Sequence, residues 1–174
     1  VQRCKIFRMK EFNAQLEQLK KGFNFFFPAT AATILSPWEL ELLICGDNQC
    51  PVSEMKKNLS YNSSESHISM LWSVLEEFTP EERMLFIKFG CGRMGLPPPG
   101  MSWSQKLAIQ IKSYNDQPDP MKPLPSATTC SSTMTIPRYE TKEWMAKKIR
   151  AAITMGADID QDRNANLRDL TEFT

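Results

Sequence analysis

The chain has 174 residues, of which 41% are hydrophobic and 24% are charged, proportions that are ordinary for a globular protein. Its 21 basic and 20 acidic side chains give a formal net charge of +1, which offers no bulk electrostatic basis for binding nucleic acid or an anionic membrane. No apolar run approaches the roughly 20 residues that a membrane helix needs, and no signal peptide is recognisable at the start. Partners therefore have to be inferred from local sites.

Three helices are predicted in the first third of the chain. Apolar residues at helical spacing predict an amphipathic helix over residues 10–22, and we expect the aromatic run 23–27 that follows it to lie in a core. Residues 36–39 form a capping box with proline at the first helical position, which predicts a second helix over 37–44. A short third helix is expected over 51–59.

A polar stretch, Ser-Tyr-Asn-Ser-Ser-Glu-Ser at residues 60–66, follows these helices and has the composition of a flexible linker. We therefore predict a domain boundary there, between residues 1–59 and 67–160, with a polar tail over 161–174. The linker is expected to act as a hinge. Its candidate hinge residues are Ser60, Tyr61, Asn62, Ser63 and Ser64.

Beyond the linker, two helices in series are predicted. An apolar stripe over residues 68–78 marks the first, and a second capping box, at 79–82, starts the other, which is expected to end at Gly90. The turn-rich segment after Gly90 contains glycines and prolines but lacks the Gly-Lys-Ser/Thr ending of a phosphate loop. Alternating apolar residues then predict a strand over 107–112.

A last helix is capped by Thr141 and is expected to end at Gly156. In the polar tail, three aspartates within residues 158–162 have the first spacings of a calcium-binding loop. Arg163, however, stands where that loop needs glycine, so no metal site is expected there.

The number of cysteines is odd and their positions are scattered, without the spacing of metal ligands or of a disulfide framework. This pattern indicates a reducing compartment. We expect a cytoplasmic protein, with a nuclear location also open. The single histidine, His67, leaves at most one partner for a Cys/His dyad, and its place at the start of an apolar helix favours a structural role. The five cysteines are Cys4, Cys45, Cys50, Cys91 and Cys130.

Residues 124–139 contain the candidate active-site residue, Cys130. A Leu-Pro pair opens this stretch with extended backbone, and alternation over 133–136 predicts a strand after the cysteine, so Cys130 lies on a loop that leads into a strand. Small neighbours leave room for a bulky partner at the sulfur; the alternative is a solvated loop with an incidental thiol. The neighbours that can donate hydrogen bonds to a developing anion are Thr128, Thr129, Ser131 and Ser132.

Two motifs around the cysteine resemble those of a known family. Leu-Pro-Ser-Ala-Thr-Thr-Cys at residues 124–130 is similar to Leu-Pro-x-Ala-His-Thr-Cys, and Ile-Pro-Arg-Tyr at 136–139 is similar to Leu-Pro-x-Tyr, both found in HECT-type ubiquitin ligases. Upstream, residues 71–97 resemble the family's helix pair and the turn after it, and residues 38–46 resemble the end of its N-lobe. The likeness runs from about residue 4 to about residue 160 and suggests a large HERC-like member.

The resemblance implies an α+β fold, in which residues 67–160 form a small C-lobe with a short mixed sheet and packed helices. Residues 1–59 would be the end of a mostly helical N-lobe. It further implies that Cys130 accepts ubiquitin from a conjugating enzyme as a thioester and passes it to a lysine of a protein substrate. The surface that docks the conjugating enzyme would belong to N-lobe sequence upstream of this chain. No cofactor, nucleic acid or membrane is implied.

The chain departs from the family pattern close to the cysteine. Thr128 replaces the histidine of the motif, Ser131 replaces the phenylalanine after the cysteine, and Gly95 replaces the arginine of an Arg-Leu-Pro turn. Thr129 and nearby backbone amides are the candidate donors to the oxyanion, while Thr128 and Ser131 are candidates for positioning ubiquitin. Phe173 is the nearest equivalent of a phenylalanine that the family uses near its C-terminus.

Two other functional classes stay open. A catalytically inactive ubiquitin-binding or scaffold module is motivated by the replaced histidine and phenylalanine. A redox-sensing thiol would also need an exposed thiolate, usually with a resolving cysteine nearby, and the sequence leaves open whether Cys91 approaches Cys130. Formation of a ubiquitin thioester separates both classes from the ligase.

Overall fold

The computed structural model describes residues 10–28, 30, 34–114 and 117–158. It divides the chain into two compact units, residues 1–44 and 45–174. In the described part of the chain, every helix is too short or too polar to cross a bilayer.

The first unit contains helix α2 (Asn13–Phe26) and most of helix α4 (Pro37–Cys45). Helix α2 continues past Gly22, where the sequence predicted its end, and closes where the Phe27 N–H donates to the Phe23 carbonyl at 2.9 Å. No residue of α2 is buried, and Phe25 and Phe26 are 82% and 87% exposed, so the aromatic run does not lie in a core of this unit. An apolar helix face is buried only where another element covers it, which local sequence does not determine.

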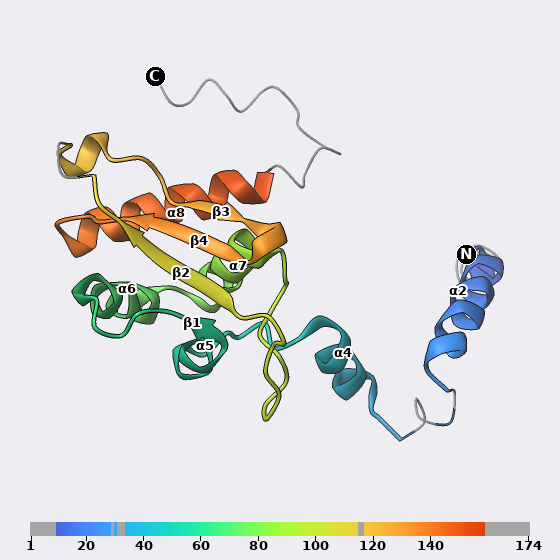
Figure 1. Ribbon diagram of the computed structural model, residues 1–174. Helices are drawn as coiled ribbons and strands as arrows, with labels where there is room; N and C mark the ends of the chain where they lie inside the picture. The colour runs from blue at the N-terminus through green and yellow to red at the C-terminus, as the bar shows by residue number, and fades with distance from the viewer. Residues whose placement is uncertain (1–9, 29, 31–33, 115–116, 159–174) are drawn as a thin grey trace. The chain divides into compact units, whose positions relative to one another are not determined.

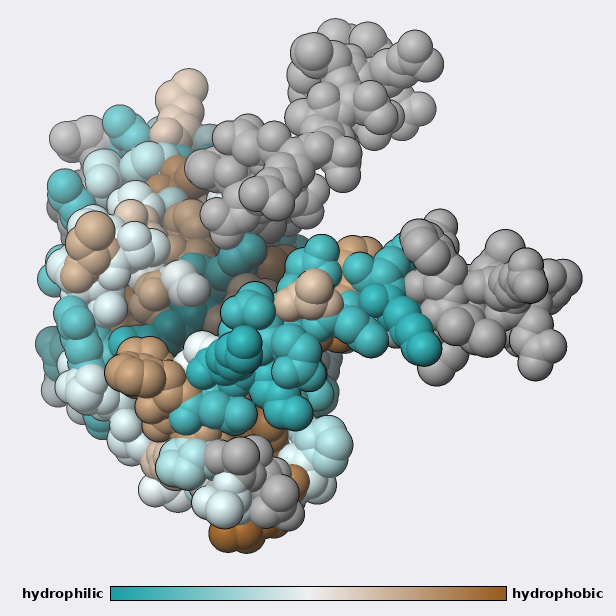
Figure 2. Space-filling model, turned by 90° about the vertical axis from the view of Figure 1, so that its right-hand side faces the viewer, coloured by the Kyte–Doolittle hydropathy of each residue, from teal (hydrophilic) through white to brown (hydrophobic). Residues whose placement is uncertain are grey.

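Exposed apolar side chains occur in both units, for example Phe26 in the first and Met101 in the second. Figure 2 shows hydrophobic residues exposed among hydrophilic ones on the face seen there.

The second unit carries α5 (Val52–Asn58), β1 (Leu59–Ser60), α6 (Ser66–Glu77), α7 (Pro80–Cys91), β2 (Leu107–Lys112), the 3-10 turn η1 (Asp119–Met121), β3 (Ser126–Thr128), the 3-10 turn η2 (Thr129–Ser131), β4 (Thr133–Pro137) and α8 (Lys142–Asp158) (Figure 1). Its described strands form one sheet in the order β1-β2-β4-β3. Strands β1, β2 and β4 are parallel, and β3 is antiparallel to β4. The predicted α+β class is confirmed.

One face of the sheet forms the core with helices. Leu107 and Ile109 of β2 and Met134 and Ile136 of β4 alternate along their strands and are buried, and α7 and α8 lie behind these strands in Figure 1. A Cβ added to Gly90 of α7 would lie 2.5 Å from a Leu107 methyl carbon and 2.8 Å from the Met134 methyl carbon. Glycine therefore allows the end of α7 to approach β2 and β4 closely, and β4 is the strand that follows Cys130.

Both predicted capping boxes are confirmed. The Ser36 N–H donates to the Glu39 carboxylate at 2.8 Å, and the Glu39 N–H donates back to the Ser36 hydroxyl at 3.2 Å. At the start of α7, Thr79 and Glu82 make the same reciprocal bonds at 2.9 and 3.2 Å. These bonds join residues three positions apart, so the local sequence is enough to predict them.

The polar stretch predicted as a linker belongs to the second compact unit, which begins at residue 45. The domain boundary predicted at this stretch stays a prediction. Ser60 lies in β1, the Tyr61 ring packs edge-on against Trp72 with 5.1 Å between centroids, and Glu65 pairs with Arg138 at 2.7 Å. These specific contacts, which the polar composition did not reveal, tie the stretch to the sheet and to α6. Its role as a hinge stays a prediction.

The chain that follows α4 is tied to the loop after α7. Asp47 and Leu96 exchange two backbone hydrogen bonds of 2.7 and 2.9 Å. Gly46 has φ +82°, and a Cβ on it would lie 2.5 Å from the Leu96 carbonyl oxygen, while a Cβ on Gly95 would lie 2.7 Å from the Asp47 carbonyl oxygen. This close backbone contact leaves no room for a side chain at residue 95 in this chain.

Candidate active site

Cys130 lies at the centre of η2, the turn that joins the antiparallel strands β3 and β4, and its side chain is exposed. The turn closes through Ser132, a buried residue in the left-handed conformation with φ +47°. For a residue other than glycine this conformation costs about 1 kcal/mol or more and needs support from its surroundings. The Ser132 N–H donates to the Thr129 carbonyl at 3.1 Å, and the Ser132 carbonyl accepts from the Ala108 N–H of β2 at 2.8 Å.

The hydroxyl group of Ser131 is used within the turn. Its Oγ lies 3.2 Å from the Thr128 carbonyl oxygen and 3.2 Å from Oγ1 of Thr133. Thr133 in turn donates to the Ser131 carbonyl at 3.3 Å. The structure thus brings the predicted site residues Thr128, Thr129, Cys130 and Ser131 together on one hairpin turn, while Phe173 lies outside the described residues.

The described cysteines differ in accessibility. Cys45 and Cys130 are exposed, Cys91 is half-buried and Cys50 is fully buried. Burial raises the pKa of the Cys50 thiol to about 11 and also raises the pKa of the Cys91 thiol, which donates to the Ile87 carbonyl at 3.3 Å. Buried and protonated thiols are poor nucleophiles at neutral pH, so Cys130 and Cys45 are the described thiols open to reaction.

His67 does not form a dyad with Cys130. Its Nε2 atom lies 3.0 Å from the Tyr139 carbonyl oxygen, just beyond the end of β4, and its Nδ1 atom lies 3.3 Å from Glu65. Cys130 precedes the start of the same strand, whose five residues span about 13 Å at roughly 3.3 Å per residue. The structural role predicted for His67, at the start of α6, agrees with these contacts.

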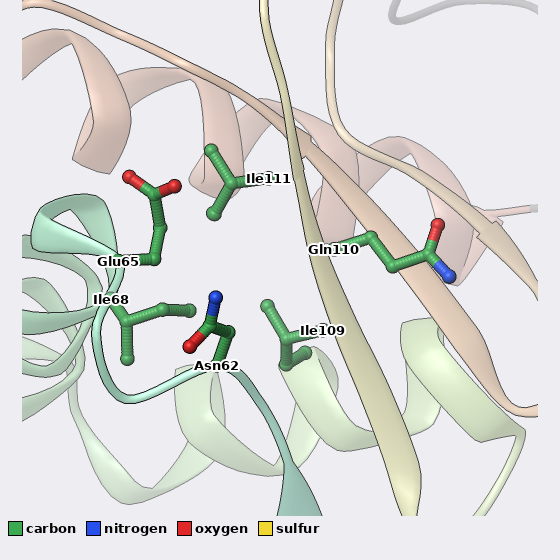
Figure 3. A pocket seen from close by; sticks show the side chains of 6 residues that line it. All are labelled: Asn62, Glu65, Ile68, Ile109, Gln110 and Ile111. Carbon is green, nitrogen blue, oxygen red and sulfur yellow. The ribbon is translucent and has the colours of Figure 1, made fainter.

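A cleft of about 360 Å³ opens beside β2, away from the cysteine. Figure 3 shows Ile109 and Ile111 facing the cleft, whereas Gln110 points away from it. The cleft lies on the β1 side of β2, and β4 and β3, which carry the Cys130 turn, lie on the other side. Cys130 therefore does not line this cleft, and its side chain is exposed at the surface. The cleft is lined by Asn62, Glu65, Ile68, Ile109, Gln110 and Ile111.

Known proteins match this chain over most of its length. The family model described as HECT-domain (ubiquitin-transferase) matches residues 1–160. The chain belongs to the HECT family. Similar relatives are the human E3 ubiquitin-protein ligase HERC2, 29% identical over 92% of this chain, and UPL4 of Arabidopsis thaliana, 35% identical over 82%. HACE1 of Bos taurus is 29% identical over 82% of the chain.

This chain spans only 3% of the length of HERC2, 10% of UPL4 and 16% of HACE1. It corresponds to a small part of each HECT relative. The family resemblance derived from the motifs around Cys130 is confirmed.

A buried ion pair near the cysteine hairpin was not predicted from the sequence. The Lys122 ammonium lies 2.7 Å from Asp119, whose carboxylate also accepts the backbone N–H groups of Glu140 at 2.9 Å and Thr141 at 3.2 Å. Burial alone would raise the pKa of Asp119, but the bonds from Lys122 and the two N–H groups hold it below its usual value. The hydrogen bond to Asp119 raises the pKa of Lys122. No local pattern in a proline-rich loop marks two charged residues as buried.

This ion pair fixes the segment that leads to Cys130 against the start of α8. Lys148 of α8 donates to the Lys122 carbonyl at 2.7 Å, and the Tyr139 hydroxyl donates to the Pro123 carbonyl at 2.6 Å.

The described residues contain no group of three or more His, Cys, Asp or Glu side chains that could hold a metal ion.

Proposed function

We propose that this chain carries the ubiquitin-accepting part of a HECT ubiquitin ligase, with Cys130 as the nucleophile. The observation that supports the proposal most strongly is the exposed thiol on a hairpin turn, within a motif of a family described as ubiquitin transferases. The proposal includes ubiquitin, a ubiquitin-conjugating enzyme and a protein substrate as partners. The conjugating enzyme would dock on N-lobe surface outside this chain.

In the first step, the Cys130 thiolate attacks the thioester carbonyl that links ubiquitin to the conjugating enzyme. A carbon–sulfur bond forms to Cys130, the bond to the conjugating enzyme breaks, and that enzyme's sulfur leaves as a thiolate. The exchange replaces one thioester by another of similar energy, so accessibility and orientation are its main requirements. The open position of Cys130 meets the first requirement.

The absence of a histidine beside the cysteine costs this step little. An ordinary thiol with pKa about 8.5 is about 3% thiolate at pH 7. Lowering the pKa by about two units would raise that fraction some twenty-fold or more, but a Brønsted slope of about 0.4 to 0.5 would cost about eight-fold of that gain. A net factor of about three is small compared with what orientation supplies.

The developing oxyanion needs hydrogen-bond donors, and the turn offers candidates. Thr129 precedes Cys130 in η2 and is exposed, so its hydroxyl group can reach a bound carbonyl. Ser131 has its hydroxyl within hydrogen-bond distance of Thr128 and Thr133, which favours a role in holding the turn. We therefore assign the donor role to Thr129 and backbone N–H groups.

In the second step, a lysine amine of the substrate attacks the same carbonyl. A carbon–nitrogen bond forms, the bond to Cys130 breaks, and the sulfur leaves as a thiolate while the nitrogen loses a proton to a base. By the family resemblance, that base is a carboxylate beside Phe173, either Asp169 or Glu172; these residues lie outside the described part of the chain. The proposal places the reaction in the cytoplasm or nucleus, where thiols stay reduced.

The redox-sensor alternative is weakened by the state of Cys91. Its thiol is half-buried with a raised pKa, which makes it a slow resolving nucleophile at neutral pH. The inactive-module alternative makes a different prediction, because it forms no adduct with ubiquitin.

The test is to charge the complete protein with ubiquitin from a conjugating enzyme and to add a reducing thiol to half of the sample. A thioester on Cys130 gives an adduct that the thiol removes and that the Cys130→Ala variant lacks. Cys45→Ala is the matched control, because Cys45 is also exposed, and it should charge normally. Charging that persists in Cys130→Ala, or no charging of the complete protein, would contradict the proposal.

A further inference from the structure

Two consecutive carbonyl groups of the turn that carries Cys130 accept hydrogen bonds from residues near the start of β2. The Ser132 carbonyl accepts the backbone N–H of Ala108 at 2.8 Å, as part of the sheet. The Ser131 carbonyl accepts Nε2–H of Gln105 at 3.1 Å, from a side chain that precedes β2. One of these bonds belongs to the ladder of the sheet, whereas the other depends entirely on the identity of residue 105.

Gln105 is itself held by the loop after α7. The Arg93 guanidinium donates to the Gln105 backbone carbonyl at 3.1 Å and lies 4.6 Å from the ring centroid of Trp103. Arg93 follows Gly92, which ends α7 in the left-handed conformation with φ +73°. A continuous set of contacts therefore runs from the end of α7, through Arg93 and Gln105, to the residue after Cys130.

We infer that Gln105 is a positioning residue for the Cys130 sulfur and that Arg93 acts through it. Ser132 holds a left-handed backbone conformation next to the turn, so the turn has a tendency to relax unless its carbonyl groups are held. The bond from Gln105, at 3.1 Å, adds to the longer bond of 3.3 Å from the Thr133 hydroxyl to the same carbonyl and resists rotation of the peptide that follows Ser131. This role rests on the proposed thioester chemistry at Cys130.

The Gln105 side chain bonds to the Ser131 carbonyl and not to the reacting sulfur, so its effect depends on orientation. A shift of about 1 Å in the attacking atom is enough to slow an oriented reaction markedly. A small electrophile, which approaches an exposed thiol from many directions, does not depend on that orientation. The ratio of the two rates thus reports positioning and not the chemical reactivity of the thiol.

The experiment uses the full chain and two probes, ubiquitin with a C-terminal vinyl methyl ester and iodoacetamide, with the labelled site mapped by mass spectrometry. Gln105→Ala should slow ubiquitin labelling of Cys130 by about two- to ten-fold, the effect expected for loss of one hydrogen bond, and leave iodoacetamide labelling unchanged. Gln49→Ala is the matched control, because Gln49 is an exposed glutamine whose amide donates one bond of 3.3 Å elsewhere. It should label at the original rate.

Two more substitutions of Gln105 test whether its side chain acts as a hydrogen-bond donor or only fills space. Gln105→Glu keeps the shape but presents oxygen atoms to the Ser131 carbonyl, so it should be at least as slow as Gln105→Ala. Gln105→Lys keeps a donor and should recover part of the rate. If Gln105→Glu labels as fast as the original chain, or if both probes slow equally, the positioning role is wrong.

Arg93 provides the second arm. Arg93→Ala should slow ubiquitin labelling less than Gln105→Ala, and the double variant should be no slower than Gln105→Ala alone, because both act through the same bond. If the losses in labelling rate add in the double variant, Arg93 does not act through Gln105. If the ubiquitin probe shows no preference for Cys130 in the unaltered chain, the proposed function and the role of Gln105 are both wrong. If the probe prefers Cys130 but the Gln105 substitutions do not change its rate, only the positioning role is wrong.

Discussion

The ammonium group of Lys122 lies 2.7 Å from the carboxylate of Asp119, and both side chains are only 5% exposed. Removing one partner of a buried pair costs about 3–5 kcal/mol, and we take the lower end, about 3 kcal/mol, because the N–H groups of Glu140 and Thr141 would still bond to the Asp119 carboxylate. We expect Lys122→Met to lower the free energy of unfolding by about that amount in urea denaturation.

An exposed pair with the same geometry provides the control for Lys122→Met. Lys57 and Glu54 are also three residues apart and also lie 2.7 Å from each other, with side chains 67% and 34% exposed. Lys57→Met should change stability by at most about 1 kcal/mol, because solvent screens exposed pairs. Equal losses for the two variants would show that burial does not strengthen the Lys122 pair.

Acid should destabilise the protein partly through Asp119. Because its pKa is held below the usual value in the folded state, Asp119 contributes stability above its unfolded pKa of about 3.9, and this contribution is lost as pH falls through the folded pKa. Urea denaturation from pH 7 to pH 3 should therefore show a smaller loss of stability on acidification for Asp119→Asn than for the unaltered chain. Parallel curves would exclude Asp119 from the acid response.

Alkylation rates should follow the burial of the cysteines. With iodoacetamide at neutral pH, we expect Cys130 and Cys45 to react first, Cys91 more slowly and Cys50 last, because burial raises the pKa of Cys50 to about 11. Peptide mapping by mass spectrometry at timed intervals gives the order. In urea the four rates should converge, and early modification of Cys50 in the folded protein would contradict its buried position.

Thr129 should affect transfer through its hydroxyl group. Loss of one oxyanion donor costs about 10²-fold or more in enclosed active sites, and we expect about ten-fold at this exposed turn for Thr129→Ala in a ubiquitin transfer assay. Thr129→Ser keeps the hydroxyl group and should transfer at close to the original rate. A serine variant as slow as the alanine variant would show that the threonine methyl group matters and the hydroxyl does not.

Glycine should be required at residue 46. Gly46→Ala combines φ +82° with a Cβ 2.5 Å from the Leu96 carbonyl oxygen, and we expect a loss of about 2 kcal/mol or more in the free energy of unfolding. Gly100→Ala has a similar φ of +85° but no atom within 4 Å, so it should cost only about 1 kcal/mol. Similar losses in both variants would mean that the backbone contact with Leu96 relaxes easily.

Features that depend on neighbours a few residues apart could be predicted from the sequence alone. The capping boxes at Ser36 and Thr79 involve residues three positions away, and the alternation in β2 reflects the side-chain period of a strand. The motif around Cys130 is a continuous run of residues, and its resemblance to the HECT family was visible without coordinates. Each of these features depends on residues that lie close together in the chain.

Contacts between residues far apart in the chain could not be predicted in this way and became known from the fold. The burial of Asp119 and Lys122 depends on the start of α8, and the contact between Gly46 and Leu96 depends on how the chain returns after α7. Gln105 reaches the Cys130 turn because β2 and β4 pair side by side. Composition cannot distinguish a polar residue held by such contacts from one in free solvent, because the partners lie on other elements and their positions follow from the packing of the whole unit.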